Sequence, residues 1–138
     1  MSQLTLEQIQ ALLDSSPMIK FMDVQLTGAE PDKSTVHFSL PMRPEFERLA
    51  GTGPIHGGAI ANFADTAGDF AVALFVGAAV PTINIRVDFL RPASGAQLTA
   101  AAVVRKLRRM VAVVDIDVFD VDSKLVAVGR GTYGRSAG

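Results

Sequence analysis

Pro54-Ile-His-Gly-Gly-Ala-Ile-Ala-Asn-Phe-Ala-Asp-Thr-Ala-Gly-Asp-Phe-Ala-Val-Ala-Leu-Phe-Val-Gly77 is the stretch that decides the fold of this chain. Its apolar residues recur at the spacing of one helical face, and the stretch ends at a glycine shortly before Pro81. These apolar positions are Ile60, Phe63, Ala64, Ala67, Ala71 and Leu74. The pattern predicts one helix over residues 54–77, around which the rest of the chain is organised.

A second stripe of the same helix is made almost wholly of small residues. Its members are Gly57, Gly58, Ala61, Asp65, Gly68 and Val72. Asp65 is the exception, and the helix contains no Lys or Arg that could pair with its carboxylate. Because a buried charge is costly unless it is compensated, Asp65 either lowers stability or has a chemical role.

The start of this helix offers backbone hydrogen-bond donors. Pro54 fixes the entry of the chain, while Gly57 and Gly58 allow another molecule to approach the backbone closely. The free N–H groups of a first helical turn, with the helix dipole behind them, can stabilise a carbonyl oxygen that becomes negative during a reaction. The glycines therefore form either an oxyanion hole or a point of tight packing.

Length and composition narrow the class of protein. With 138 residues, of which 49% are hydrophobic and 20% charged, the chain is expected to form one domain over residues 1–138. A formal net charge of -1 argues against a nucleic-acid partner, and the lack of cysteine excludes a thiol nucleophile. The two histidines, His37 and His56, lack the spacing of a zinc site, so we expect no metal.

The amino-terminal residues show no signal-peptide pattern, and residues 70–81 are too short to span a bilayer. We therefore expect a cytoplasmic protein without a membrane partner.

The sequence around the central helix predicts an antiparallel sheet. Residues 5–8 match a capping box, so we expect an amino-terminal helix within residues 1–17. A hairpin of two strands, over residues 21–27 and 34–40, should follow it.

Four strand-like runs follow the central helix, over residues 82–90, 97–107, 111–120 and 124–133. Short connections join the last three runs, so these neighbours should pair antiparallel. The chain as a whole predicts an α+β fold in which an antiparallel sheet wraps around one long central helix.

Two motifs at this spacing resemble those of one enzyme family. The segment His56-Gly-Gly-Ala-Ile-Ala-Asn-Phe-Ala-Asp65-Thr-Ala, with Asp88-Phe-Leu-Arg-Pro-Ala93 and the order of strands, resembles the hotdog-fold acyl-CoA thioesterases. The phenylacetate-degradation thioesterases and the related hydroxybenzoyl-CoA thioesterases are most similar. The resemblance implies a hotdog fold and hydrolysis of the thioester between an acyl group and coenzyme A. Because CoA is then part of the substrate, no separate cofactor is expected.

The resemblance also implies roles for individual residues. Asp65 corresponds to the acid that acts as the nucleophile or as the general base that activates water. The backbone N–H of Gly57 or Gly58 corresponds to the donor that polarises the thioester carbonyl. Family members often carry Asn or Gln six residues before the motif histidine, where this chain has Ala50.

Helix geometry predicts that two chains share each site. Gly58 and Asp65 lie on one face of the helix but about 10 Å apart along its axis, at ~1.5 Å per residue. A reacting carbonyl must lie about 3 Å from both groups, so two antiparallel helices in a symmetric dimer would bring Gly58 of one chain to Asp65 of the other. The resemblance likewise implies a homodimer with sites at its interface, often doubled into a homotetramer.

Three further residues near the motif are candidates for the chemistry. Asp69, one turn beyond Asp65, could be the acid instead. His56 is either a general base or a hydrogen-bonded structural residue at the helix start. Thr82 lies where the family places a hydroxyl near the acid, and it could equally be an ordinary strand threonine.

Several residues are candidates for contact with the substrate. Arg105, Lys106, Arg108 and Arg109 cluster around one turn, which either meets the phosphates of CoA or is a solvated basic turn. Arg91 either binds substrate or caps the strand-end motif. Asn62, within the helix, is a further substrate-binding candidate.

Two other functions remain open beside thioester hydrolysis. A hydratase or dehydratase of acyl thioesters on the same fold would pair its acid with a catalytic histidine. A non-catalytic acyl-thioester binding protein is the other alternative, because Ala50 replaces a polar residue of the family. Thioester hydrolysis is the leading prediction, and the sequence does not name the acyl group.

Overall fold

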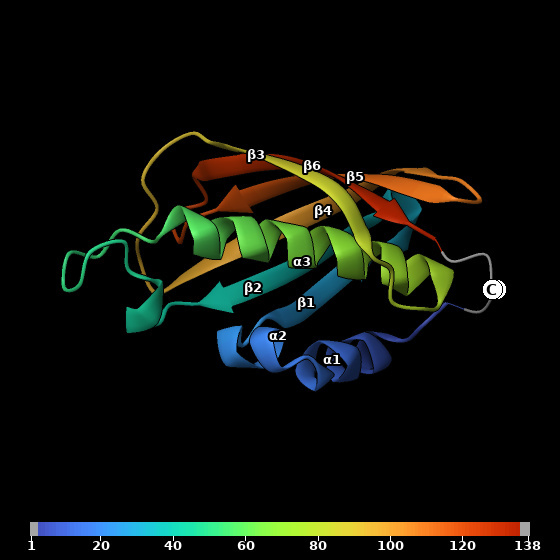
Figure 1. The fold of residues 1–138 in the computed structure, drawn as a ribbon, viewed down its shortest axis with the longest axis horizontal. Coiled ribbons are helices and arrows are strands. Elements are labelled where there is room, and N and C mark those ends of the chain that lie inside the picture. The colour runs from blue at the N-terminus through green and yellow to red at the C-terminus, as the bar shows by residue number, and fades with distance from the viewer. Residues whose placement is uncertain (1–2, 136–138) are drawn as a thin grey trace.

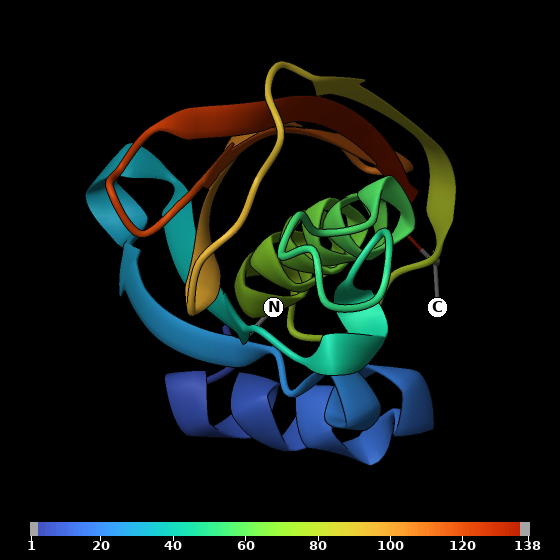
Figure 2. The same cartoon turned by 90° about the vertical axis from the view of Figure 1, so that its left-hand side faces the viewer.

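A six-stranded antiparallel sheet curls around one long helix, α3 (Gly57–Val76), in a computed structural model that describes residues 3–135 (Figure 1). The strands lie in the order β1-β2-β4-β5-β6-β3. Their bounds are β1 (Gln25–Glu30), β2 (Thr35–Pro41), β3 (Thr82–Phe89), β4 (Gln97–Leu107), β5 (Val111–Phe119) and β6 (Leu125–Gly134). Figure 2 shows the sheet bent around α3. The predicted α+β class, with a sheet wrapped around one central helix, is confirmed.

The prediction that α3 begins at Pro54 is wrong, because the helix begins at Gly57. The N–H groups of Ile55 and His56 donate to carbonyls of two distant segments, at 2.8 and 2.6 Å, and these contacts hold the backbone extended before the helix. The predicted end is close to the observed one. Gly77 terminates α3 with a φ of 84°, a left-handed conformation that glycine adopts without steric cost.

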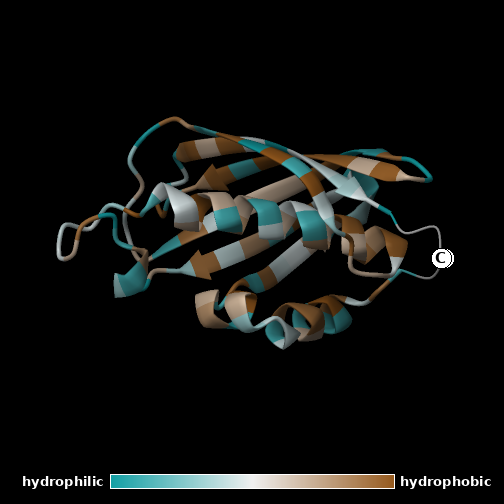
Figure 3. Cartoon of the chain, viewed as in Figure 1, coloured by the Kyte–Doolittle hydropathy of each residue, from teal (hydrophilic) through white to brown (hydrophobic). Residues whose placement is uncertain are grey.

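The core lies between α3 and the concave face of the sheet. Along β4 and β5, buried residues alternate with more exposed ones, as expected for strands that cover a core on one face. Figure 3 shows hydrophobic, brown bands separated by paler or teal bands along the strands of the sheet. The α3 residues that pack against them include Ile60, Phe63, Ala64, Ala67, Phe70, Ala71 and Leu74. Each large apolar side chain buried in this way contributes about 1.5–3 kcal/mol to stability.

By length and composition alone, α3 could cross a membrane, but 67% of its most apolar window is buried inside this fold. Burial within a sheet accounts for a helix that is apolar on most of its surface.

The amino-terminal region forms two helices, α1 (Leu6–Ser15) and α2 (Pro17–Met22). The predicted capping box is confirmed: the Thr5 hydroxyl accepts from the Gln8 N–H at 3.1 Å, and Gln8 Oε1 accepts from the Thr5 N–H at 2.8 Å. Residues 1 and 2, which the predicted helix included, lie outside the described residues.

The predicted strand over residues 21–27 is wrong at its start. Pro17 opens α2 as its first residue, a position where the missing N–H of proline costs nothing. Asp23 ends α2 with a φ of 60°, so β1 begins two residues after it and extends to Glu30. A short helical turn, η1 (Pro31–Lys33), joins β1 to β2, and a second, η2 (Pro44–Phe46), follows β2.

The predicted pairing of the last three strands is confirmed, since β5 pairs antiparallel with both β4 and β6. The sequence did not predict the place of β3, which pairs with β6 at the edge of the sheet. Its other edge has no partner within residues 3–135, and Ile83 and Phe89 on this strand expose 60% and 55% of their surface. An open strand edge with exposed apolar side chains pairs readily with another chain.

Tyr133 of β6 ties the sheet to α3. Its side chain is completely buried, and its hydroxyl donates to the backbone carbonyl of Asp65 at 3.3 Å. Burial raises the pKa of the Tyr133 hydroxyl, so the group stays protonated as a donor. The ring crosses α3 at Gly68, where a Cβ atom would overlap the Tyr133 hydroxyl and ring. Glycine at position 68 is therefore required for this close approach.

We predict that Gly68→Ala destabilises the fold by about 1–3 kcal/mol, because the added methyl group overlaps Tyr133 in a close-packed core. Urea denaturation measures the change. Gly28→Ala is the matched control, since nothing lies within 4 Å of a Cβ at that position. Equal free energies of unfolding for the two variants would contradict the contact.

Candidate active site

Asp65 lies on the strip of α3 that the sheet leaves partly exposed. Its Oδ1 accepts a hydrogen bond from the Thr82 hydroxyl at 2.8 Å. Thr82 is the first residue of β3, so the helix acid meets the open edge strand at this point. Asn62 and Asp69, on the neighbouring turns, are also only partly buried. The structure thus brings together two of the predicted catalytic residues, Asp65 and Thr82.

Asp69 is a second carboxyl group beside Asp65. Burial, and then the negative charge of Asp65, raises the pKa of Asp69 from 3.8 to about 7. A hydrogen bond from the Val80 backbone opposes part of this rise. Oδ1 of Asp69 is buried and has no hydrogen-bond partner among residues 3–135. Below about pH 7, Asp69 is therefore a neutral, proton-bearing neighbour of Asp65.

The N–H groups of the two glycines at the start of α3 have different partners. The Gly58 N–H donates to Nδ1 of His56 at 2.9 Å, so His56 is the N-cap of the helix. The Gly57 N–H has no acceptor within the described part of the chain, and Gly57 lines a cavity. Of the two donors that the sequence left open, Gly57 is the one available to a ligand.

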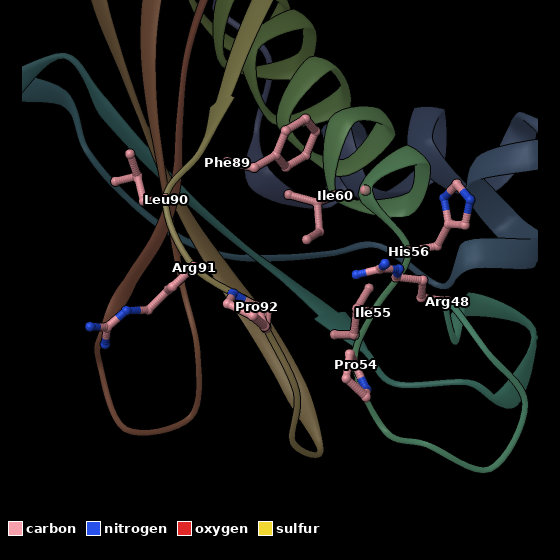
Figure 4. A pocket seen from close by; sticks show the side chains of 11 residues that line it. Arg48, Pro54, Ile55, His56, Ile60, Phe89, Leu90, Arg91 and Pro92 are labelled. Carbon is pink, nitrogen blue, oxygen red and sulfur yellow. The ribbon is translucent and has the colours of Figure 1, made fainter.

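This cavity has a volume of about 540 Å³ and lies where the start of α3 meets the end of β3 (Figure 4). Ile60 and Phe89 form part of an apolar wall, while Arg48 and Arg91 add positive charge. In Figure 4 the Arg91 side chain extends away from His56. A free N–H beside an apolar wall and two guanidinium groups suits an anionic ligand that carries a carbonyl group.

Gly57 and Asp65 do not meet in one chain. They are eight residues apart on a continuous helix, which separates them by about 12 Å along its axis. Asp65 is not among the residues that line the cavity beside Gly57. One chain therefore presents a hydrogen-bond donor at one place and a carboxylate at another.

The basic turn between β4 and β5 lies at the opposite end of α3 from His56 (Figure 1). Arg105 donates to Asp115 at 2.8 Å, and Arg130 of β6 binds the same carboxylate at 2.6 Å. The structure does not bring this turn to the cavity of its own chain. The residues concerned are Arg105, Lys106, Arg108 and Arg109.

The other two substrate-binding candidates lie near the start of α3. Arg91 borders the cavity of Figure 4. Asn62 borders a second, smaller cavity, and its Oδ1 accepts from the Thr66 hydroxyl at 3.1 Å.

Sequence reasoning did not assign Arg48 or Phe89, although both line the first cavity. Phe89 belongs to the strand-end motif that contains Arg91, so the motif carried a signal for it. Arg48 lies in an irregular loop without periodicity, which left no signal. Among residues 3–135, no group of three His, Asp or Glu side chains is placed to hold a metal ion.

Comparison with known proteins adds independent information. A family model described as the thioesterase superfamily matches residues 52–127. A Halobacterium salinarum protein named as an esterase is 33% identical over an alignment of 138 residues, gaps included. This alignment covers 91% of this chain and 88% of that protein.

The solved structure of a protein from the thioesterase superfamily has a TM-score of 0.88 at 30% identity, covering 95% of this chain and 98% of that chain. The acyl-coenzyme A thioesterase PaaI of Escherichia coli is 29% identical over an alignment of 140 residues, gaps included. This alignment covers 100% of this chain and 96% of that protein. Its structure gives a TM-score of 0.81 and covers 97% of this chain and 98% of that chain.

Asp69→Asn should change how stability depends on pH. The folded chain holds a proton on Asp69 up to about pH 7, whereas the unfolded chain loses it near pH 3.8. The free energy of unfolding of the parent therefore falls as pH rises between these values. An Asn side chain does not ionise, so the variant does not lose this stability, and its amide oxygen can still accept from the Val80 N–H. We expect the variant to be about 1–2 kcal/mol more stable than the parent at pH 8, and little different at pH 4.

Thermal unfolding between pH 4 and pH 8 measures this difference. The exposed Asp122→Asn variant is the matched control and should follow the parent at every pH. A pH-independent difference between Asp69→Asn and the parent would show that Asp69 does not hold the proton.

Proposed function

The chain belongs to the thioesterase superfamily of thioester hydrolases and has the hotdog fold, and on this premise we propose that it hydrolyses an acyl-CoA at a site shared by two copies of the chain. Asp65 supplies the acid, and the partner subunit's Gly57 supplies the N–H that polarises the thioester carbonyl. The observation that carries the proposal is the Thr82 hydroxyl bound to Asp65 on the open strip of α3. The name of the E. coli relative, an acyl-coenzyme A thioesterase, supports the choice of a coenzyme A ester.

The proposed dimer forms through β3. Its free edge and its exposed Ile83 and Phe89 favour pairing with β3 of a second copy across a two-fold axis. The partner's α3 then runs antiparallel to the first, and the start of one helix approaches the middle of the other. This arrangement removes the separation of about 12 Å between donor and acid within a single α3. Assembly of dimers into a tetramer stays a prediction.

The proposed reaction needs a carboxylate, a hydrogen-bond donor and water. Asp65 either attacks the carbonyl carbon or removes a proton from the attacking water, and Thr82 holds the carboxylate in place for both routes. The partner subunit's Gly57 stabilises the negative oxygen that forms. The thioester C–S bond then breaks, and the CoA sulfur leaves as a thiolate that takes up a proton. In the nucleophilic route, water then hydrolyses the anhydride between Asp65 and the acyl group, which frees the acid and restores the carboxylate. In the general-base route, the proton that Asp65 removed from water passes to the thiolate. No cofactor takes part in these steps.

Two sets of basic residues are proposed to hold the coenzyme. Arg48 and Arg91 border the cavity at Gly57 of their own chain. The two-fold axis reverses the second copy, so its basic turn lies at the same end of the dimer as this cavity. The phosphates of CoA could then meet Arg105, Lys106, Arg108 or Arg109 of the partner subunit.

Asp65→Asn should lower kcat for a panel of acyl-CoA esters by about a thousandfold, because it removes the nucleophile or base but keeps the size of the side chain. Thr82→Val should lower kcat by about tenfold, since the carboxylate loses its orienting hydroxyl, and Thr82→Ser should retain activity. Circular dichroism serves as the check on folding. Activity of Asp65→Asn within a few-fold of the parent would transfer the role of the acid to Asp69.

Gly57→Pro tests the backbone donor with little disturbance. Proline is well accepted at the first position of a helix, and His56 before it has the extended backbone that proline requires. The substitution removes the N–H and should lower kcat by about a hundredfold or more. Gly57→Ala is the matched control, because it keeps the N–H and its Cβ lies 3.3 Å from the flexible Phe89 ring. Equal activities of the two variants would exclude this donor.

Mixing two inactive variants tests the sharing of the site. A heterodimer of Asp65→Asn and Gly57→Pro chains contains one site with both defects and one site with neither. Reassociation of the mixed chains should therefore restore up to about half of the parent activity per heterodimer. No recovery, with heterodimers demonstrated by mass spectrometry, would place the whole site within one chain.

A further inference from the structure

A second cavity, of about 250 Å³, also borders the start of α3, and it is distinct from the cavity in Figure 4. Its walls come from α2, η2 and the first turns of α3. The contribution of α3 is compact, since Gly58 and Ala59 carry little or no side chain. His56 borders both cavities, so both lie next to the helix start where the Gly57 N–H is found.

The outer wall of this cavity is apolar although it is exposed. Met18 and Phe21 of α2 keep 59% and 45% of their surface exposed. The Phe21 ring meets Phe46 edge-on, with centroids 6.4 Å apart, and the Arg43 guanidinium stacks 4.0 Å from the Phe21 centroid. These contacts fix Phe21, whereas the unbranched Met18 side chain can adapt. Exposed apolar side chains gathered around a hollow are typical of a binding site.

Size and charge decide which part of an acyl-CoA fits this cavity. It is smaller than the range of about 300–1,000 Å³ in which drug-sized ligands bind, so it holds a compact group and not the coenzyme. Glu45 on its wall would repel phosphates, whereas Arg48 and Arg91 border the first cavity. A thioester held at the Gly57 N–H would therefore direct its coenzyme to the first cavity and its acyl group to the second.

We propose that this second cavity binds the acyl group and selects a single aromatic ring or an unbranched chain of about six carbons, with Met18 setting the upper limit of length. The inference rests on the proposed function, since it takes the thioester to lie at Gly57. Each CH₂ group that enters the cavity strengthens binding by about fourfold until the cavity is full. Longer chains then meet Met18.

Two opposite substitutions of Met18 test the inference, with kcat/KM measured for acetyl-, hexanoyl-, benzoyl- and dodecanoyl-CoA. Met18→Trp reduces the volume and should lower the hexanoyl-to-acetyl and benzoyl-to-acetyl ratios by at least about tenfold. Met18→Ala enlarges the cavity and should raise the dodecanoyl-to-hexanoyl ratio by about threefold or more. The matched controls are Met110→Trp and Met110→Ala, at a methionine that is 58% exposed on the β4–β5 turn. Both controls should leave all three ratios unchanged.

Calorimetry with S-ethyl-CoA and S-hexyl-CoA separates this inference from the proposed function, because these thioethers bind without being hydrolysed. If Met18→Trp binds S-hexyl-CoA more weakly than the parent does, the inference is supported. If the parent also hydrolyses none of the esters, the proposed function is overturned and the inference still stands. Unchanged ratios and unchanged thioether affinities in both Met18 variants would overturn the inference while hydrolysis stands. Loss of the dimer in Met18→Trp with unchanged ratios would also overturn it and would make the cavity a subunit contact.

Discussion

A sheet that closes around a single helix leaves one strip of that helix uncovered, and this constraint governs the rest of the molecule. Where the sheet covers α3, the helix must be narrow enough for Tyr133 to lie across it, which is why Gly68 faces that ring. The uncovered strip accommodates the carboxylate of Asp65, whereas Asp69, one turn further on, has one carboxyl oxygen buried without a partner among residues 3–135. Since β3 borders the same strip and ends the sheet, the wrapping that builds the core also creates the surface proposed for a second chain.

The sequence predicted the elements whose own residues determine their conformation. The strand over residues 97–107 has the predicted bounds, and the capping box at Thr5 formed as expected, because both depend on local patterns. The errors arose where distant contacts decide the structure. The start of α3 is set by hydrogen bonds from Ile55 and His56 to other segments, and the place of β3 beside β6 depends on the topology of the whole sheet.

The candidate site divides in the same way. Residue types and spacing were enough to select Asp65 and the two glycines, whereas Thr82 was selected from the family resemblance, and the catalytic roles of all four stay predictions. The sequence could not show which glycine N–H is free, since that depends on how the His56 ring is turned. The second cavity was missed because no helix was predicted over residues 18–22, and residues 21 and 22 were assigned to a strand. The contact between Phe21 and Phe46 in the wall of this cavity involves the helix that forms there.

The hydrogen bond between Gly58 and His56 also fixes the chemical state of the histidine. A backbone N–H can only donate, so Nδ1 must carry a lone pair, and the proton of the neutral ring lies on Nε2. The other ring nitrogen, Nε2, then presents an N–H at the border of both cavities. The motif histidine thus closes the first turn of the helix with one ring nitrogen and offers a hydrogen-bond donor with the other.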